Sequence, residues 1–471
     1  AARYVSGYLL TDATHAASHA WAEAWVPQAQ AWLGFDVTHK RLAGPELCRL
    51  AVGRDYADAS PMRGMHAATS YTDMYAVSYG ALYGITPGGV ASNLGALTTF
   101  SGAVSMADDG TRILIVDGTN GYYWNTQTST FSTTADADFP NGATSCGFLA
   151  GRFLANVPGT GAFAWGDLYA DTWPTLNTAT AESSPDNLVA IFVNAGQLML
   201  LGGSTTEWWA TTSDANLPYA PVQGAVAEWG LAAPLALCKF GASSVAWLGR
   251  NRLGQVQVVQ ADGYQVRPIS IPDVDYLINN YTAVDDATMY AYMLGGHPML
   301  EISFPSAGKS WLYDARSEAW SVLTTGNLGR HYTQYGVAYN GKTRVSDYQT
   351  GDIYTLDPDV YTDNGQTIRR SIVGRHIFKG DPMSISEMWI DMEMGVGLPN
   401  GQGSNPQLML RTSKDGGHVW SNEIWSGIGP QGVYQRRGVF RRLGRARDWL
   451  FELSIADPVK PVFIGAFMEA A

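Results

Sequence analysis

An imidazole and a carboxylate near the N-terminus could act together in acid–base chemistry. Residues 18–26 alternate bulky or polar side chains with alanine and valine, which predicts a strand with His19 on one face, although the alanine content also fits a helix. Pro27 ends this run, and residues 31–36 predict a second strand that could pair with the first. Such a hairpin would bring His19 near Asp36.

Two other titratable residues have a weaker claim to chemistry. Glu207 follows a Gly-Gly-Ser turn, where its carboxylate could serve as an acid in an enzyme site. No second carboxylate or histidine recurs at a spacing that would pair with it, which favours a structural role. His297 lies in a Gly-Gly-His-Pro run and is interpreted as a turn residue. The 8 histidines are scattered, so we expect no metal site and no cofactor.

Positive charge is concentrated in one short segment. Arginine binds carboxylate and phosphate through planar, bidentate contacts, so this segment could touch DNA in a channel or the acidic surface of a neighbouring subunit. Because the chain as a whole is acidic, contact between subunits is favoured. The arginines are Arg436, Arg437, Arg441, Arg442, Arg445 and Arg447.

Residues 413–420 resemble an Asp-box hairpin. In this motif Asp415 caps the turn, Gly416 and Gly417 adopt backbone angles that favour glycine, and Trp420 packs underneath. The motif recurs in sugar-cleaving propellers, where it is structural. It therefore supports a fold and supplies no catalytic residue.

Composition limits the function further. The chain has 471 residues, enough for two or more domains, and its 46% of hydrophobic residues exclude general disorder. A formal net charge of −12 disfavours general nucleic-acid binding, because most of the surface repels phosphate. Cys48, Cys146 and Cys238 lack metal-ligand spacing and are predicted to be buried thiols. No apolar run is long enough to span a bilayer.

The elements that carry these residues are predicted to be strands. Between residues 79 and 354 an aromatic-bearing strand and a polar turn recur every ~40 to 55 residues, the length of a four-stranded propeller blade. One aromatic anchor can be assigned to each of seven units, although a sandwich of irregular hairpins is the alternative. The anchors are Tyr83, Tyr123, Trp165, Trp209, Tyr264, Tyr313 and Tyr354.

The predicted fold class is all-β. Residues 1–66 form a separate N-terminal segment with a different residue pattern, residues 67–365 form the β-propeller-like domain, and residues 366–471 form a C-terminal β-sandwich-like domain. The second boundary lies after the polar, turn-rich residues 357–366, where new strands begin.

Four stretches of the N-terminal segment resemble the C-terminal half of bacterial transglutaminase-like cysteine peptidases: YVSGYL (4–9), HAWAE (19–23), WLGFD (32–36) and AVGRDYAD (51–58). The resemblance implies that His19 activates a thiolate and that Asp36 orients the imidazole. The nucleophilic cysteine of that family lies upstream of the histidine, in a segment that would precede Ala1. None of the three cysteines present occupies that place, so we expect residues 1–66 to be a catalytically inactive, transglutaminase-like fragment, a fusion artefact or the tail of a larger enzyme.

From about residue 62 to the C-terminus the chain resembles the packaged-DNA stabilisation proteins, or tail hub proteins, of short-tailed double-stranded DNA phages. The matching segments are GAVSMA (102–107), AESSPD (181–186), GSTTEW (203–208), WLYD (311–314) and RRLGRAR (441–447). The resemblance implies a virion protein, assembled in the bacterial cytoplasm as a homo-hexameric ring that meets the portal adaptor and other tail proteins. Double-stranded DNA would pass through the lumen, and contact with the host envelope would be indirect.

On this interpretation the protein is not an enzyme and has no small-molecule substrate. The alternatives are a transglutaminase-like cysteine peptidase whose nucleophile segment is missing, and a carbohydrate-active propeller. The first requires a cysteine upstream of His19. The second requires two carboxylates ~5–9 Å apart in one pocket.

Overall fold

The computed structural model describes residues 2–10, 16–27, 31–36, 40–43, 47–53, 61–68, 70–181, 183–326 and 328–470. Within these residues the chain forms strands and a single helix, α1 (Pro272–Asn279). The chain divides into two compact units, residues 1–324 with 328–356, and residues 325–327 with 357–471. The prediction of an all-β chain is confirmed.

The N-terminal segment forms one antiparallel sheet in the order β4-β3-β2-β1-β5. In it β2 pairs with β3, with Ala22 opposite Phe35, so the predicted strand pairing is present and the helical alternative is wrong. The alternating Trp21 and Glu23 are both buried on one face of β2, and the indole of Trp21 donates to the Glu23 carboxylate at 3.3 Å. The strands are β1 (Ala2–Leu10), β2 (Ala16–Val26), β3 (Ala31–Asp36), β4 (Arg41–Leu42) and β5 (Leu47–Gly53).

Seven further antiparallel sheets form the blades of a propeller, one sheet for each blade. Blade 1 contains β6 (Met62–His66), β7 (Met74–Ser78), β8 (Ala81–Ile85) and β9 (Ala91–Ala96). Blade 2 contains β10 (Ser105–Asp108), β11 (Arg112–Val116), β12 (Gly121–Asn125) and β13 (Thr130–Thr133). Blade 3 contains β14 (Cys146–Leu149), β15 (Arg152–Asn156), β16 (Ala162–Trp165) and β17 (Thr178–Thr180). Blade 4 contains β18 (Leu188–Asn194), β19 (Gln197–Gly202), β20 (Thr206–Thr211) and β21 (Tyr219–Ala227).

The remaining blades show two variations. Blade 5 divides its first strand into two pieces and contains β22 (Gly230–Leu231), β23 (Leu237–Lys239), β24 (Val245–Arg250), β25 (Val256–Asp262) and β26 (Gln265–Pro268). Blade 6 contains β27 (Thr288–Leu294), β28 (His297–Phe304), β29 (Lys309–Asp314) and β30 (Ala319–Leu323). Blade 7 has three strands among the described residues: β31 (Thr333–Tyr339), β32 (Lys342–Asp347) and β33 (Ile353–Leu356).

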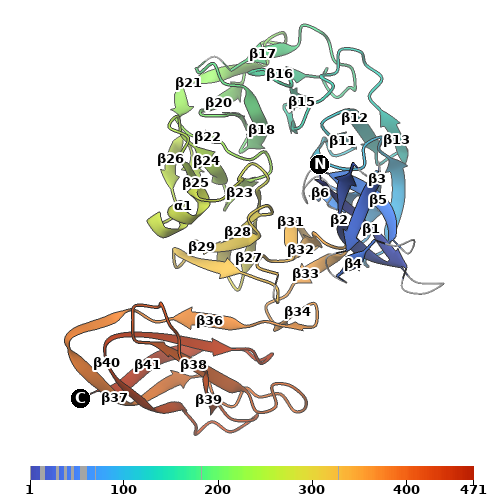
Figure 1. Cartoon of the computed structure of the whole chain (residues 1–471). Helices are drawn as coiled ribbons and strands as arrows, with labels where there is room; N and C mark the ends of the chain where they lie inside the picture. The colour runs from blue at the N-terminus through green and yellow to red at the C-terminus, as the bar shows by residue number, and fades with distance from the viewer. Residues whose placement is uncertain are drawn as a thin grey trace. The chain divides into compact units, whose positions relative to one another are not determined.

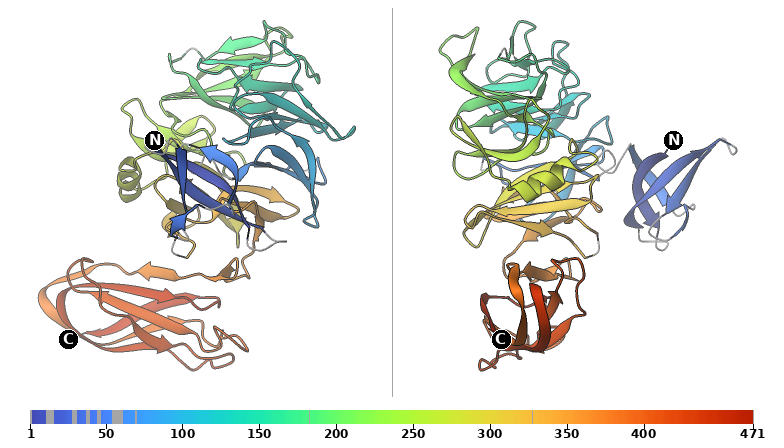
Figure 2. Two further views of the ribbon diagram at one scale, coloured as in Figure 1. Left: turned by 45° about the vertical axis from the view of Figure 1, so that its right-hand side comes forward. Right: turned by 60° about the vertical axis from the view of Figure 1, so that its left-hand side comes forward.

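The blades form a closed ring. First strands of successive blades contact one another, for example β6 with β10 and β10 with β14, and β31 of blade 7 returns to β6 of blade 1. Figure 1 shows the blades around a common centre, and Figure 2 shows them from two further directions. The seven-bladed propeller is therefore confirmed. The strand β6, assigned from the sequence to the N-terminal segment, belongs to its first blade.

Most of the predicted aromatic anchors lie on the same strand of their blade. Six of them lie on the third strand of their blade: Tyr83, Tyr123, Trp165, Trp209, Tyr313 and Tyr354. Tyr264 was a wrong anchor, because it lies in the turn between β25 and β26 and is 40% exposed. The third strand of blade 5 instead presents the buried Val258 and Val259, which a search for aromatic residues overlooks.

Five of the interfaces between successive blades are filled by hydrophobic clusters, from the interface of blades 1 and 2 to that of blades 5 and 6. The helix α1 packs Val274 and Ile278 into the last of these. Among the described residues no such cluster joins blade 7 to either neighbour. The ring is closed there by hydrogen bonds, since the Tyr339 hydroxyl donates to the carbonyls of Thr72 (2.7 Å) and Ile85 (3.2 Å).

The second unit begins at residue 357, earlier than the predicted boundary at 365, because β33 ends at Leu356 and the polar residues after it pair with each other. Two short strands, β34 (Thr362–Asp363) and β35 (Gln366–Thr367), form this hairpin. The domain then contains β36 (Arg370–Val373), β37 (Ile377–Met392), β38 (Gln407–Ser413), β39 (Ile424–Gly427), β40 (Gly438–Ile455) and β41 (Phe463–Ala470).

The long strand β40 joins two layers. Its first half pairs with β37, which continues to β41, and its second half pairs with β36 and β38. Buried methionines of β37 and large apolar residues of β40, including Phe440 and Trp449, fill the core of this domain. The predicted C-terminal β-sandwich is confirmed.

Candidate assembly surface and buried acids

The six arginines lie at the start of β40 and along its first half, and all six are exposed. Phe440, Leu443 and Trp449 point into the core between them. Arg442 has a positive φ of 60° and Gly444 one of 96°. Between Arg441 and Gly444 β40 has one residue more than β37 has between Ile385 and Glu387, so β40 bulges here.

Neighbouring strands neutralise some of this positive charge. Arg441 Nε lies 2.7 Å from Glu387 Oε2, and Arg437 Nε lies 3.5 Å from Asp391 Oδ1. Arg445 donates to the Pro382 carbonyl at 3.4 Å. Among the described residues, Arg436, Arg442 and Arg447 have no hydrogen-bond or ion-pair partner in the chain. These three guanidinium groups can bind a carboxylate or phosphate without breaking an existing contact.

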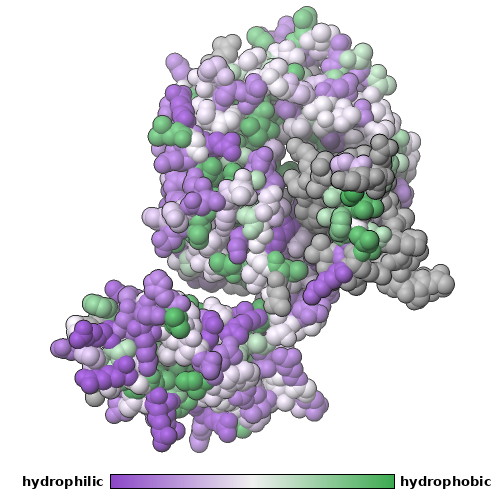
Figure 3. All heavy atoms as spheres, viewed as in Figure 1, coloured by the Kyte–Doolittle hydropathy of each residue, from purple (hydrophilic) through white to green (hydrophobic). Residues whose placement is uncertain are grey.

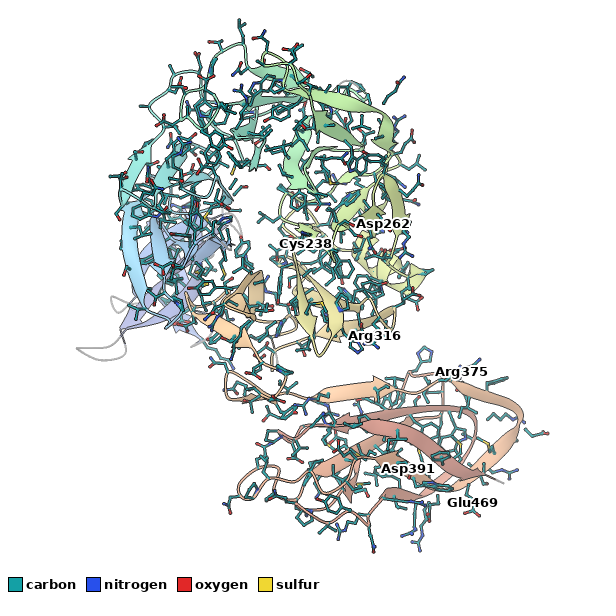
Figure 4. All side chains as sticks on the ribbon, turned by 180° about the vertical axis from the view of Figure 1, so that it is seen from behind. Cys238, Asp262, Arg316, Arg375, Asp391 and Glu469 are labelled. Atoms are coloured by element: carbon teal, nitrogen blue, oxygen red, sulfur yellow. The ribbon has the colours of Figure 1, made fainter. Side chains whose placement is uncertain are left out.

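An aromatic pair lies between the two ion pairs. Trp389 of β37 stacks on Phe467 of β41 with ring centroids 5.9 Å apart, and Phe467 remains 48% exposed. Figure 4 labels Asp391 and Glu469 on these strands, and Figure 3 shows hydrophobic residues among the hydrophilic surface of this unit. We call this surface the β37 face. Its residues are Glu387, Trp389, Asp391, Arg437, Arg441 and Phe467.

A hollow of about 360 Å³ adjoins the β37 face. Residues of both signs of charge line it, namely Arg436, Arg437, Asp391 and Glu393, together with the 76%-exposed Ile464. Tryptophan and arginine are enriched at the centres of protein interfaces, and charges at the rim give register. The arrangement is suited to contact with another folded protein.

The Asp-box segment forms a tight turn. The Val419 amide donates to Asp415 Oδ1 at 2.9 Å, and the Ser413 hydroxyl donates to the same oxygen at 2.7 Å. These hydrogen bonds lower the pKa of Asp415. Gly416 and Gly417 have φ of 73° and 96°, and Trp420 receives a cation–π contact from Arg411 at 5.5 Å.

The structure describes the two residues of the His/Asp pair, His19 and Asp36, to different extents. His19 lies in β2 opposite Gly7 of β1, and its side chain is outside the described part of the structure. Asp36 ends β3 and is 1% exposed.

Burial raises the pKa of the Cys146 thiol to about 12, so that cysteine remains protonated at neutral pH and is a poor nucleophile.

Glu207 is a structural acid. Its carboxylate accepts from the Ser183 amide (2.7 Å) and from the Trp209 indole (3.0 Å), and the side chain is 5% exposed. His297 is the first residue of β28, and its Nδ1 lies 2.8 Å from Asp314 Oδ2. Both side chains are therefore engaged in contacts that hold their own blades together.

A buried acid that the sequence did not indicate lies between blades 6 and 7. Glu301 is fully buried and accepts a hydrogen bond from the Tyr290 hydroxyl at 2.6 Å. His331 Nδ1 lies 2.9 Å from Glu301 and 2.8 Å from Thr333 Oγ1. Burial raises the pKa of Tyr290 well above its ordinary value. The cluster is a polar core.

A small cavity lies at the centre of the propeller. First strands of the blades enclose a cavity of about 490 Å³, in which His66 Nε2 lies 2.9 Å from Asp108 Oδ2. This volume is within the range of small-molecule pockets and is far too small for a DNA duplex. The described residues contain no group of three potential metal ligands and no helix able to cross a membrane.

Comparison with known proteins supports the same architecture. Over 312 residues the chain is 26% identical to the tail hub protein gp10 of Salmonella phage P22, covering 64% of each protein, so the match spans somewhat less than two thirds of that relative. An uncharacterised protein of Mycobacterium bovis, Mb2599c, is 40% identical over 89 residues, 17% of this chain and 28% of that one.

Among solved structures, a chain of the mitotic checkpoint complex aligns with 12% identity and a TM-score of 0.42, over 64% of this chain and 92% of that one. This likeness is too distant to carry an argument. Two family models match over most of the chain. The model described as Bacteriophage P22 Gp10, beta-propeller, covers residues 51–361, and the model described as Bacteriophage P22 Gp10, beta-sandwich, covers residues 369–471. The chain therefore belongs to the bacteriophage P22 Gp10 family.

Proposed function

We propose that this protein is a structural, non-enzymatic component of a phage tail, and that several copies form a ring through the arginines of the C-terminal domain. The relationship to a P22 tail hub protein supports the tail role. The observation that carries the ring is the small cavity at the centre of the propeller. Because a cavity of about 490 Å³ cannot hold duplex DNA, a conduit for DNA would be enclosed by several copies.

The ring would have six copies and would meet the portal adaptor and other tail proteins in the virion, after assembly in the host cytoplasm. Contact with the host envelope would be indirect. Charge supports this arrangement in two ways. A chain with a net charge of −12 would give a lumen that repels phosphate and lets DNA slide, and its acidic surface would supply carboxylates for the arginines of a neighbouring copy.

Arg436, Arg442 and Arg447 are the residues to change, because they have no partner within the described part of their own chain. We expect the triple substitution to glutamate to abolish ring formation, since it replaces three attractive contacts per interface with repulsion. Folding should be unaffected, because the three side chains are exposed. The control is Arg316→Glu in blade 6, which makes the same kind of substitution at one exposed arginine outside the C-terminal domain.

The measurement is particle imaging and sedimentation of the full chain, alone and with its portal and adaptor partners. A closed ring for the wild type and the control, with only single copies for the triple variant, supports the proposal. If the triple variant assembles as the wild type does, the three arginines do not form the interface. A wild-type chain that remains a single copy with every partner would overturn the ring itself.

A further inference from the structure

A cavity of about 750 Å³ lies between blade 7 and blade 1. Blade 1 lines it with alternate residues of β7, namely Met74, Ala76 and Ser78, which share one face of the strand. Since both ends of β7 take part, the cavity extends for about 13 Å, the length of five residues at ~3.3 Å per residue. Blade 7 contributes Arg344 and Ile353 to the opposite wall.

The cavity adjoins a strand edge that is occupied in the other blades. In blades 1 to 6 a further strand pairs with the strand equivalent to β33, whereas β33 pairs only with β32 among the described residues. The Asp347 amide donates to the Asp352 carbonyl at 3.0 Å, and hydrogen-bonded pairs then alternate along the ladder. Ile353 and Thr355 therefore direct their backbone N–H and C=O groups away from β32, toward the open edge.

Side chains at the edge indicate what would fit there. Ile85, which is partly exposed, makes an apolar floor with the buried Met62, Met74 and Ala76. Arg344 of the facing wall donates to the Thr355 hydroxyl, and no carboxylate among the described residues pairs with it. An extended segment beside β33 would satisfy the backbone groups, place alternate side chains over the apolar floor, and offer a carboxylate to Arg344.

We propose that the seam between blades 7 and 1 is a binding site for an extended polypeptide segment of a partner protein, which adds the fourth strand of blade 7. The segment carries apolar side chains at alternate positions and an aspartate or glutamate that pairs with Arg344. This site is in the propeller and does not depend on the arginines of the C-terminal domain.

The test begins with a displayed library of random seven-residue peptides, selected on the full-length chain. Selected peptides are synthesised with a fluorescent label, and their affinity is measured by anisotropy. We expect alternating apolar residues with one acidic residue, and at least a tenfold loss of affinity for Ala76→Trp, which fills the cavity. The matched control is Ala96→Trp at the exposed end of β9, which does not line the cavity.

A second variant, with the charge at Arg344 reversed, tests the proposal if Ala76→Trp does not fold. The Arg344→Glu variant should no longer bind the acidic peptides. It should bind versions of them in which lysine replaces the acidic residue. In hydrogen exchange followed by mass spectrometry, a bound peptide should slow exchange in residues 353–356. Failure to enrich any alternating peptide, or equal binding to wild type, Ala76→Trp and Arg344→Glu, would overturn the proposal.

Discussion

Arg63 provides a demanding test of how the propeller is held together. This residue of β6 is 1% exposed, and it donates to the carbonyls of Gly102 (2.6 Å), Tyr79 (2.8 Å) and Thr99 (2.8 Å) and to the Thr99 hydroxyl (2.8 Å). Burial lowers its pKa, and the nearby Asp117 opposes that effect. One guanidinium thus satisfies backbone groups from three different segments near the first two blades.

Arg63→Met keeps most of the side-chain volume and removes every donor. A fully buried carbonyl left without a partner costs ~1–3 kcal/mol, so the three partly buried carbonyls set an upper limit of ~3–9 kcal/mol. Part of this is offset, because the variant no longer buries a charged group. We therefore expect the free energy of unfolding to fall by ~3–5 kcal/mol. The free energy of unfolding of Arg63→Lys should lie between those of the wild type and Arg63→Met, because an ammonium cannot reach all three segments.

The assay is urea unfolding of the full-length chain, followed by tryptophan fluorescence. Since the chain has two compact units, the transition of the propeller is fitted separately and that of the C-terminal unit serves as an internal reference. Arg252→Met is the matched control, because Arg252 lies in the propeller, is 55% exposed and forms an ion pair with Glu228 that contributes only ~0–1 kcal/mol. If Arg63→Met lost less than about 1 kcal/mol, the assignment of Arg63 as the necessary partner of these carbonyls would be wrong.

Three further predictions concern single residues. Burial alone would raise the pKa of Asp314, but hydrogen bonds from Ser317 and His297 lower it to about 2 from 3.8. Asp314→Asn should therefore reduce the urea midpoint above pH ~4. The difference in midpoint between the variant and the wild type should vanish as the pH falls toward 2. Arg442→Gly should be neutral or stabilising by ~1 kcal/mol in thermal unfolding, because it relieves a left-handed backbone, whereas Gly444→Ala should destabilise. Cys146 should resist iodoacetamide in the folded chain at pH 8 and react after denaturation, as scored by peptide mass spectrometry; rapid modification of the folded chain would contradict its burial.

The sequence predicts the blades well because their chemistry is local. Asp117 and Gly118 form a turn between two apolar runs, and Asp117 accepts the amide of Asn120 at 2.7 Å, so neighbouring residues alone specify the hairpin. Aromatic anchors such as Tyr123 are recognised for the same reason. Blade 5 was misread at Tyr264, because its third strand is built from valines that carry no distinctive signal.

The candidate sites were harder to predict because they join distant residues. Arg441 meets Glu387, and Glu301 meets His331 and Thr333, and nothing in the spacing of these residues indicates the contacts. The arginine cluster was evident as a charge run, but its division into paired and unpaired guanidinium groups depends on the register of β37 and β40. The cavity beside β33 adjoins an edge where blade 7 has no fourth strand among the described residues, which a repeating sequence pattern does not reveal.

The closing contact of Tyr339 with Thr72 joins residues 267 positions apart in the chain, and this separation has a consequence for how the protein folds. Each blade pairs neighbouring strands, so blades can form in order as the ribosome releases them. The seam must wait until nearly three quarters of the chain exists, and it carries the largest loop-closure entropy cost in the ring. Closure of the ring is then expected to be the last and slowest step in folding of the propeller, and an unclosed ring would be the species most exposed to proteases.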